Sequence, residues 1–166
     1  MKQKILSVIA AAIATTFVTS CNKKTISETS KSQKEMKAIQ FRIARPTNNL
    51  TEVIKFYHEG LGLDILGQFK DHAGYDGVML GIPDKTHHLE FTQHINKEPL
   101  PKPTKENLIV LYYDKPEEYK KANERIQKMG IAPVEPENPY WKGKSETYED
   151  PDQWRVILFN GVYNPE

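Results

Sequence analysis

Leu108-Ile109-Val110-Leu111-Tyr112 begins the second pass of a pattern that the chain has already run through once. The first pass begins with a similar apolar strand at residues 39–44, continues through an amphipathic helix and glycine-punctuated strands, and ends at residues 89–91. The second pass has the same order and ends at residues 156–159. Two strand–helix–strand–strand–strand units of equal weight predict an α+β fold with two curled sheets. A cleft shared by the two sheets is a natural place for a small molecule.

An amphipathic helix is predicted after the first strand of the first pass. Its apolar residues fall at i, i+3, i+4, i+7 and i+11, namely Leu50, Val53, Ile54, Tyr57 and Leu61. Asn49 and Glu52 have the spacing of a capping box, and Gly60 or Gly62 can supply the left-handed residue that ends the helix. Because the apolar stripe is one-sided, the helix covers one face of a sheet and leaves the other face to the cleft.

The second pass contains a matching helix. Pro116 suits its first turn, and Lys128 followed by Gly130 predicts its end. The apolar stripe of this helix consists of Tyr119, Ala122, Ile126 and Met129. We therefore expect the two passes to form similar modules.

The first 20 residues have the pattern of a secretory signal. Lys2 and Lys4 precede an apolar run at residues 5–18, which is too short to span a bilayer core of ~30 Å. The run leads into Val18-Thr19-Ser20-Cys21, which resembles a bacterial lipobox, and Cys21 is the only cysteine in the chain. The resemblance implies that Cys21 is lipidated and that the protein is exported and anchored to a bacterial membrane, on the periplasmic side. The alternative is a buried or spare thiol.

The rest of the chain divides into a tether and one domain. Residues 21–37 are rich in Lys, Ser and Thr and have too few apolar side chains to order themselves, so we expect a flexible tether. Residues 38–162 are long enough for a domain with its own core. The net charge is +1 and no basic stripe is interleaved with aromatics, so nucleic acid is not an expected partner.

A polar strand face in the first unit is a candidate chemical site. Alternate residues of a strand share one face, and in the segment 88–94 these are His88, Glu90, Thr92 and His94. The other face carries apolar residues and is expected under the helix. A carboxylate flanked by imidazoles suits Glu90 as a ligand or base and His88 as a ligand or proton carrier. A solvated polar face of an antiparallel sheet is the alternative.

Four segments occupy the positions of motifs in a known superfamily. They are Phe-Tyr-His-Glu-Gly-Leu-Gly-Leu at 56–63, Asp-Gly-Val-Met-Leu-Gly at 76–81, His-Leu-Glu-Phe at 88–91 and Glu-Asp-Pro-Asp at 149–152. In this order they resemble the vicinal oxygen chelate superfamily, which includes glyoxalase I, extradiol dioxygenases, fosfomycin-resistance enzymes and bleomycin-resistance proteins. Gln153 replaces the glycine of the superfamily's Asp-Pro-Asp-Gly turn. The resemblance covers residues 39–160, and segments 42–47 and 138–141 resemble an uncharacterised glyoxalase-like branch.

The resemblance implies paired βαβββ modules, at about residues 38–95 and 106–160, that form a cup-shaped open barrel. In metal-using members, the first and last strands of each module hold a divalent ion at the base of the cup. The residues carried over to these positions are Gln40 or Phe41, Glu90, Asn107 and Ile157. Isoleucine cannot ligate, and one carboxylate with two amides is a weak ligand set. We therefore expect the usual metal centre to be missing; the ligands of a divalent ion, if one binds, would be Glu90 and Gln40.

Further side chains are candidates for binding a ligand. Arg42 and Arg45 lie on opposite faces of a regular strand, so one guanidinium enters the cup and can clamp a carboxylate or phosphate; a surface ion pair is the alternative. Trp141, in the loop 138–144, either covers the cup or folds onto the domain edge. Tyr112 and its neighbour place one phenol toward the cup. The predicted binding set is Arg42, Arg45, His94, Asn107, Tyr112 and Trp141.

Two classes of function are compatible with these residues. The first is a glyoxalase-like lyase or isomerase in which Glu90 acts as base or ligand and an arginine holds an anionic group. The second is a binding protein of the bleomycin-resistance type, which sequesters a small molecule without chemistry. The expected partners are a small-molecule ligand or substrate, the membrane through lipidated Cys21, and a second copy of the chain in a homodimer.

Overall fold

The computed structural model describes residues 38–82 and 87–164. The predicted signal segment, the lipidated Cys21 and the tether lie outside the described residues. In the described part of the chain, no helix is long and apolar enough to cross a membrane.

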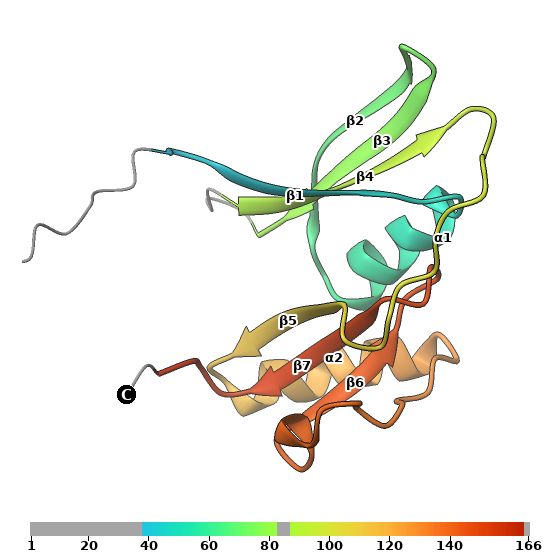
Figure 1. The fold of residues 1–166 in the computed structure, drawn as a ribbon. Coiled ribbons are helices and arrows are strands. Elements are labelled where there is room, and N and C mark those ends of the chain that lie inside the picture. The colour runs from blue at the N-terminus through green and yellow to red at the C-terminus, as the bar shows by residue number, and fades with distance from the viewer. Residues whose placement is uncertain (1–37, 83–86, 165–166) are drawn as a thin grey trace, which may run out of the picture. The chain divides into compact units, whose positions relative to one another are not determined.

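The first module is a four-stranded sheet with one helix (Figure 1). Its elements are β1 (Phe41–Pro46), α1 (Leu50–Ile54), a π-helical continuation (Lys55–Gly60), β2 (Asp64–His72), β3 (Tyr75–Gly81) and β4 (His87–His94). The strand order is β1-β4-β3-β2, in which β1 and β4 are parallel and the other neighbours are antiparallel. This is the predicted strand–helix–strand–strand–strand unit.

The second module has one strand fewer than predicted. Its elements are β5 (Leu108–Tyr113), α2 (Pro116–Lys128), a 3-10 turn (Pro139–Trp141), β6 (Ser145–Glu149) and β7 (Arg155–Asn160), with strand order β5-β7-β6. The segment after α2 runs beside β6, where the Val134 backbone N–H donates a hydrogen bond to the Thr147 carbonyl at 2.8 Å, but it forms no strand. Pro133 and Pro136 explain the difference, because proline has no N–H to give to a sheet.

The α1 helix covers the predicted face but begins and ends differently from the expectation. The Asn49 side chain makes no cap bond to the helix, so the predicted capping box is wrong; its amide instead donates to Asp152 at 2.9 Å. From Lys55 the helix widens into the π-helical turn, and Gly62, with φ of +82°, ends it.

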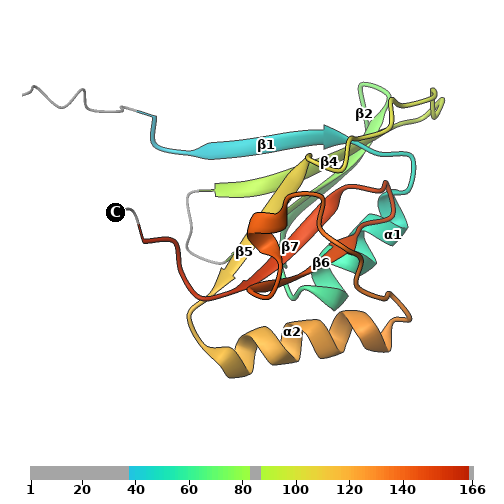
Figure 2. The same ribbon diagram turned by 60° about the horizontal axis from the view of Figure 1, so that its bottom comes forward.

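The α2 helix follows its local sequence signals closely. It begins with Pro116 at its first turn and ends at Lys128, and Gly130 has a φ of +82°. Ala122 and Ile126 are fully buried beneath it. Figure 2 shows the helix lying along the three-stranded sheet of its own module.

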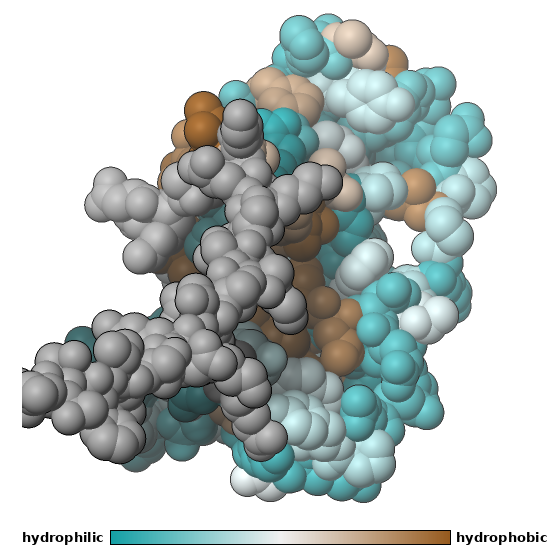
Figure 3. All heavy atoms as spheres, turned by 60° about the vertical axis from the view of Figure 1, so that its left-hand side comes forward, coloured by the Kyte–Doolittle hydropathy of each residue, from teal (hydrophilic) through white to brown (hydrophobic). Residues whose placement is uncertain are grey.

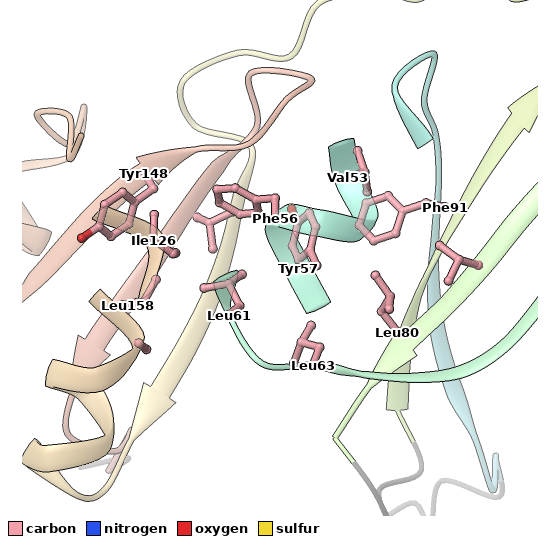
Figure 4. Close-up of a cluster of buried hydrophobic side chains, with 13 residues drawn as sticks. Val53, Phe56, Tyr57, Leu61, Leu63, Leu80, Phe91, Ile126, Tyr148 and Leu158 are labelled. Atoms are coloured by element: carbon pink, nitrogen blue, oxygen red, sulfur yellow. The ribbon is translucent and has the colours of Figure 1, made fainter. Parts of the chain in front are cut away.

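One hydrophobic core joins the two modules (Figure 4). Phe56 and Tyr57 of the π-helical turn lie at its centre, and the Tyr57 ring lies 4.8 Å from that of Phe91 in β4. From the second module, α2, β6 and β7 contribute to the same cluster. Their buried side chains are Ala122, Ile126, Tyr148, Val156 and Leu158. Because both helices pack into this core, one face of each sheet remains outside it.

A buried ion pair links the same two modules at the end of β1. Arg45 donates from Nη2 to Asp150 Oδ2 at 2.5 Å, and the Tyr57 hydroxyl donates to the same oxygen at 2.8 Å. The guanidinium lies 4.7 Å from the ring centres of both Phe91 and Trp154. Burial raises the pKa of the Tyr57 phenol well above its usual value, and the Asp150 carboxylate adds to this effect. The Asp-Pro-Asp motif thus supplies a carboxylate that fixes Arg45.

Candidate functional site

The candidate site is the face of the first sheet that does not pack on α1. Val78, Leu80 and Phe91 point into the core, so their alternate neighbours along β3 and β4 point the other way. The strand register sets residues of three strands side by side on this second face. Its members are Arg42, Ala44 and Pro46 of β1, His88, Glu90, Thr92 and His94 of β4, and Tyr75, Gly77, Met79 and Gly81 of β3.

Arg42, His88 and Glu90 form a bonded trio on this face. Arg42 donates from Nε to His88 Nε2 at 2.9 Å and from Nη1 to Glu90 Oε2 at 2.8 Å. The Arg42 side chain is 47% exposed, whereas that of Glu90 is only 13% exposed. Because a guanidinium can only donate, His88 Nε2 is the acceptor in this hydrogen bond. The trio therefore presents a fixed cation to solvent, held from below by a carboxylate and an imidazole.

A cavity of about 290 Å³ lies further along the same face. Thr92 and His94 line it from β4, Tyr75 lines it from β3, and Leu100 of the connection between the modules lines it from above. The ring centres of Tyr75 and His94 lie 4.8 Å apart, edge to face. Gly77 and Gly81 of β3 have no side chains on this face, and the Phe69 ring and the Leu66 side chain take the space above them. The sequence had not singled out Tyr75, although its pairing with His94 follows from the hairpin register.

The two arginines of β1 lie on opposite faces, as alternation predicts. Arg42 belongs to the candidate site, whereas Arg45 is 6% exposed and paired with Asp150. Arg45 was expected as a possible clamp for a ligand; the structure places it in a buried ion pair instead. The alternative predicted for these arginines was an ion pair at the surface. Arg45 does form an ion pair, but a buried one, and the alternation of strand faces alone cannot predict that burial.

Gln40 and Asn107 do not lie where a shared metal centre would need them. Glu90 is the cross-strand partner of Ala44, whereas Gln40 precedes β1 and stands four residues before Ala44, roughly 13 Å away along extended chain. Asn107 uses its side-chain oxygen in a turn, where it accepts from the Thr104 backbone N–H at 2.7 Å. The register therefore separates Gln40 from Glu90, its expected partner in binding a metal.

Tyr112 and Trp141 belong to the second module. The rings of both lie near Phe159 of β7, with centres 5.4 Å and 6.1 Å away. Trp141 is half-buried in this aromatic cluster, and its indole N–H is buried without a partner among the described residues. Of the two predicted placements for Trp141, packing onto its own module is the one that the structure shows. Tyr112 is 45% exposed beside it.

The residues present do not fit the superfamily's divalent metal. Among residues 38–82 and 87–164, no three His, Cys, Asp or Glu side chains come together as metal ligands. Glu90 Oε2 and His88 Nε2 are hydrogen-bonded to the Arg42 guanidinium, which carries a positive charge at the place where a metal would bring one. On β7, Ile157 is fully buried, and it pairs with Val110 of β5. We therefore derive no chemical step through a metal.

Comparison with known proteins agrees with this fold. Residues 41–92 match the YycE-like N-terminal domain and residues 106–160 match the YycE-like C-terminal domain. The chain is 46% identical over 123 residues to the uncharacterised protein YycE of Bacillus subtilis, a match that spans 74% of this chain and 88% of that protein.

Solved structures extend the comparison. The crystal structure of the Bacillus subtilis YycE protein, described as a candidate glyoxalase/fosfomycin-resistance protein, aligns with a TM-score of 0.72 at 45% identity, over 76% of this chain and 93% of that one. The trypanothione-dependent glyoxalase I of Leishmania major shares only the fold, with a TM-score of 0.58 at 22% identity, over 76% and 88% of the two chains. The same holds for TnmS3, an antibiotic-binding protein from Streptomyces sp. CB03234, with a TM-score of 0.55 at 19% identity, over 76% and 98%.

The matches confirm the superfamily expected from the motifs. Both halves of the domain are matched in the predicted order, and the match at 46% identity covers most of the relative. The chain therefore belongs to the YycE-like family, within the glyoxalase and fosfomycin-resistance superfamily.

Proposed function

We propose that the protein binds a small organic anion on the Arg42 face of the first sheet. The observation that carries the proposal is the half-exposed Arg42 guanidinium, fixed by His88 and Glu90. A guanidinium has five N–H donors, and Arg42 uses two of them within the trio, so the others can reach a carboxylate or phosphate. Because the side chain is already oriented, a ligand need not order it.

The adjacent cavity gives the ligand's body a place to lie. Tyr75, Thr92 and His94 provide an aromatic surface, a hydroxyl and an imidazole on the same face as Arg42. Its volume of about 290 Å³ is at the lower limit for sites that take small molecules, roughly 300 Å³. A ligand that meets both parts must extend along the strands from the Arg42 guanidinium to Thr92, with its anionic group at one end.

A second candidate function is a glyoxalase-like lyase or isomerase reaction on the same ligand. Glu90 favours it, since Arg42 bonds to Oε2, and among the described residues Oε1 accepts no hydrogen bond. A carboxylate oxygen at a ligand site can take a proton from carbon if it comes within hydrogen-bond reach. Glyoxalase I of Leishmania major shares this fold, and so does an antibiotic-binding protein, so the fold supports both candidates.

The proposal includes the location predicted from the first 21 residues. An exported domain, anchored through a lipid on Cys21, would meet its ligand outside the cytoplasm. Figure 3 shows apolar residues on the side of the molecule that lies at the left in Figure 1. Exposed apolar side chains are found around the beginning of β1 and in the segment just after β7. They include Ile39, Phe41, Val162 and Tyr163. Such a surface suits contact with another protein, and we include a second copy of the chain as the proposed partner.

Calorimetric titration of the full-length protein tests the binding proposal. Pyruvate, lactate, benzoate and inorganic phosphate serve as probes, and at least one is expected to bind saturably. Arg42→Ala should weaken that binding by roughly tenfold or more, because it removes charge-assisted hydrogen bonds. Lys121→Ala, which removes an exposed cation on α2, is the matched control and should bind as the native protein does.

The outcomes separate the two functions. Equal binding by the Arg42→Ala and Lys121→Ala variants, or no saturable binding of any probe, contradicts the proposal. Conversion of a bound probe to product, lost in Glu90→Gln but kept in Lys121→Ala, establishes the enzyme instead of the binding protein.

A further inference from the structure

Glu90 and Ile157, the two last-strand positions carried over from the superfamily's metal site, have apolar partners across their sheets. The superfamily's metal positions lie on the first and last strands of each module, which are β1 and β4 in one module and β5 and β7 in the other. The register pairs Ala44 with Glu90 and, at the matching place, Val110 with Ile157. Glu90 is the one residue of these four that can ligate a metal. The second module therefore contributes no ligand at the matching place.

The first module nevertheless contains two good donors close together. His88 and Glu90 are two residues apart on β4, on one face, so their side chains are neighbours. An imidazole nitrogen and a carboxylate oxygen both suit Zn²⁺ and Ni²⁺. The Arg42 guanidinium lies against both of them, with nitrogens 2.9 Å from His88 Nε2 and 2.8 Å from Glu90 Oε2.

We propose that His88 and Glu90 form half of a metal site that Arg42 closes, so that the side chain at position 42 decides whether a divalent ion binds. The proposal rests on the same fixed guanidinium as the proposed function. It adds that this guanidinium is the resident cation of the site.

Charge and geometry both support this exclusion. A divalent ion that binds through His88 Nε2 and Glu90 Oε2 must first break two hydrogen bonds, one of them an ion pair. It would then lie beside the charge of Arg42, which cannot be lost. Position 42 is the direct cross-strand neighbour of His88, on a strand ~4.8 Å away, and shares its face. A neutral histidine at position 42 would therefore bring an imidazole nitrogen beside His88 and Glu90 as a third donor, without a positive charge.

Metal content and thermal melting of the full-length protein test the inference. The native protein and Arg42→Lys, dialysed against NiCl₂ and then against buffer, should retain far less than one ion per chain. Arg42→His should retain about one Ni²⁺ per chain, the number expected for one site with three protein ligands. Its melting temperature should rise with NiCl₂ and return with a chelator. The double variant Arg42→His, Glu90→Gln should bind Ni²⁺ roughly tenfold more weakly or worse.

Each outcome has a defined meaning. Stoichiometric metal in the native protein, lowered by Glu90→Gln, overturns the proposal, and so does an Arg42→His variant that melts as a folded protein without gaining metal. Neither result depends on anion binding, which is measured separately with Arg42→Ala. A metal-free native protein that binds no anion would leave this inference standing and remove the proposed function.

Discussion

Arg42 and Arg45 stand three residues apart on one strand and have different roles. Both are arginines of β1, yet one is half-exposed beside Glu90 and the other is buried between two aromatic rings. Alternation separates their faces. Burial separates their roles, because a buried charge needs a permanent partner and Asp150 provides it.

The Asp150 carboxylate is predicted to stabilise the fold by pairing with the buried Arg45. In Asp150→Asn, one amide oxygen can still accept from the backbone N–H groups of Asp152 and Trp154, but the charge opposite Arg45 is lost. Leaving a buried guanidinium without its carboxylate should lower the free energy of unfolding by about 3 kcal/mol. Chemical denaturation followed by circular dichroism measures this loss.

Asp152→Asn is the matched control for the loss of Asp150. Asp152 lies 3.5 Å from Arg45 Nη2 and is partly exposed, so its replacement should cost about 1 kcal/mol. Equal losses in the two variants would show that Asp150 does not carry the buried charge of Arg45.

At the scale of the elements, local signals predicted the helices better than the strands. Pro116, Lys128 and Gly130 determine the ends of α2 through backbone chemistry that involves only near neighbours. A third strand was predicted after α2 because the two modules were expected to be equal. Pro133 and Pro136 already argued against that strand in the local sequence.

The candidate site was predictable only in part, for a related reason. Alternation along β4 placed His88 and Glu90 on one face, since it needs no information beyond the strand itself. The bonds from Arg42 depend on the register between β1 and β4, which are parallel and 46 residues apart along the chain at this pair. Nothing local determines such a register, so Gln40 or Phe41 was the residue expected at the first-strand position, whereas Ala44 is the one that lies opposite Glu90.

Gly77 of β3 is predicted to be needed for the packing of β2 on β3. A Cβ there would overlap the ring of Phe69 on β2, the cross-strand partner of Gly77. An aromatic ring over a glycine stabilises paired strands, so Gly77→Ala should displace the ring and cost about 1–3 kcal/mol. Thermal melting of the variant measures the loss.

Gly67→Ala on β2 provides the comparison. Its added Cβ would meet only the terminal methyl of Met79, at 2.7 Å, and a flexible methionine can move away. The loss should therefore be smaller than in Gly77→Ala. A Gly77→Ala variant as stable as the native protein would show that Phe69 has another place to lie.

In the molecule as a whole, the two modules have similar folds, but the candidate site belongs to the first module only. The two modules share a core and an ion pair, yet the bonded trio and its cavity belong to the first module and its connection. The second module has Val110 and Ile157 at the matching positions and an aromatic cluster around Phe159. We infer that the first module is specialised for the ligand and the second for support.

The domain is predicted to be held at a membrane by a lipid on Cys21. If Cys21 is lipidated, the full-length protein produced in a bacterium should sediment with membranes and be released by detergent, because each buried methylene contributes about 0.8 kcal/mol. Cys21→Ala should lose both the lipid and the sedimentation while melting at the same temperature, since residue 21 precedes the compact unit 37–166. Metabolic labelling with a clickable fatty acid, with Ser20→Ala as control, detects the lipid directly. A labelled Cys21→Ala variant, or a native protein found only in the supernatant, would contradict lipid anchoring without affecting the proposed ligand site.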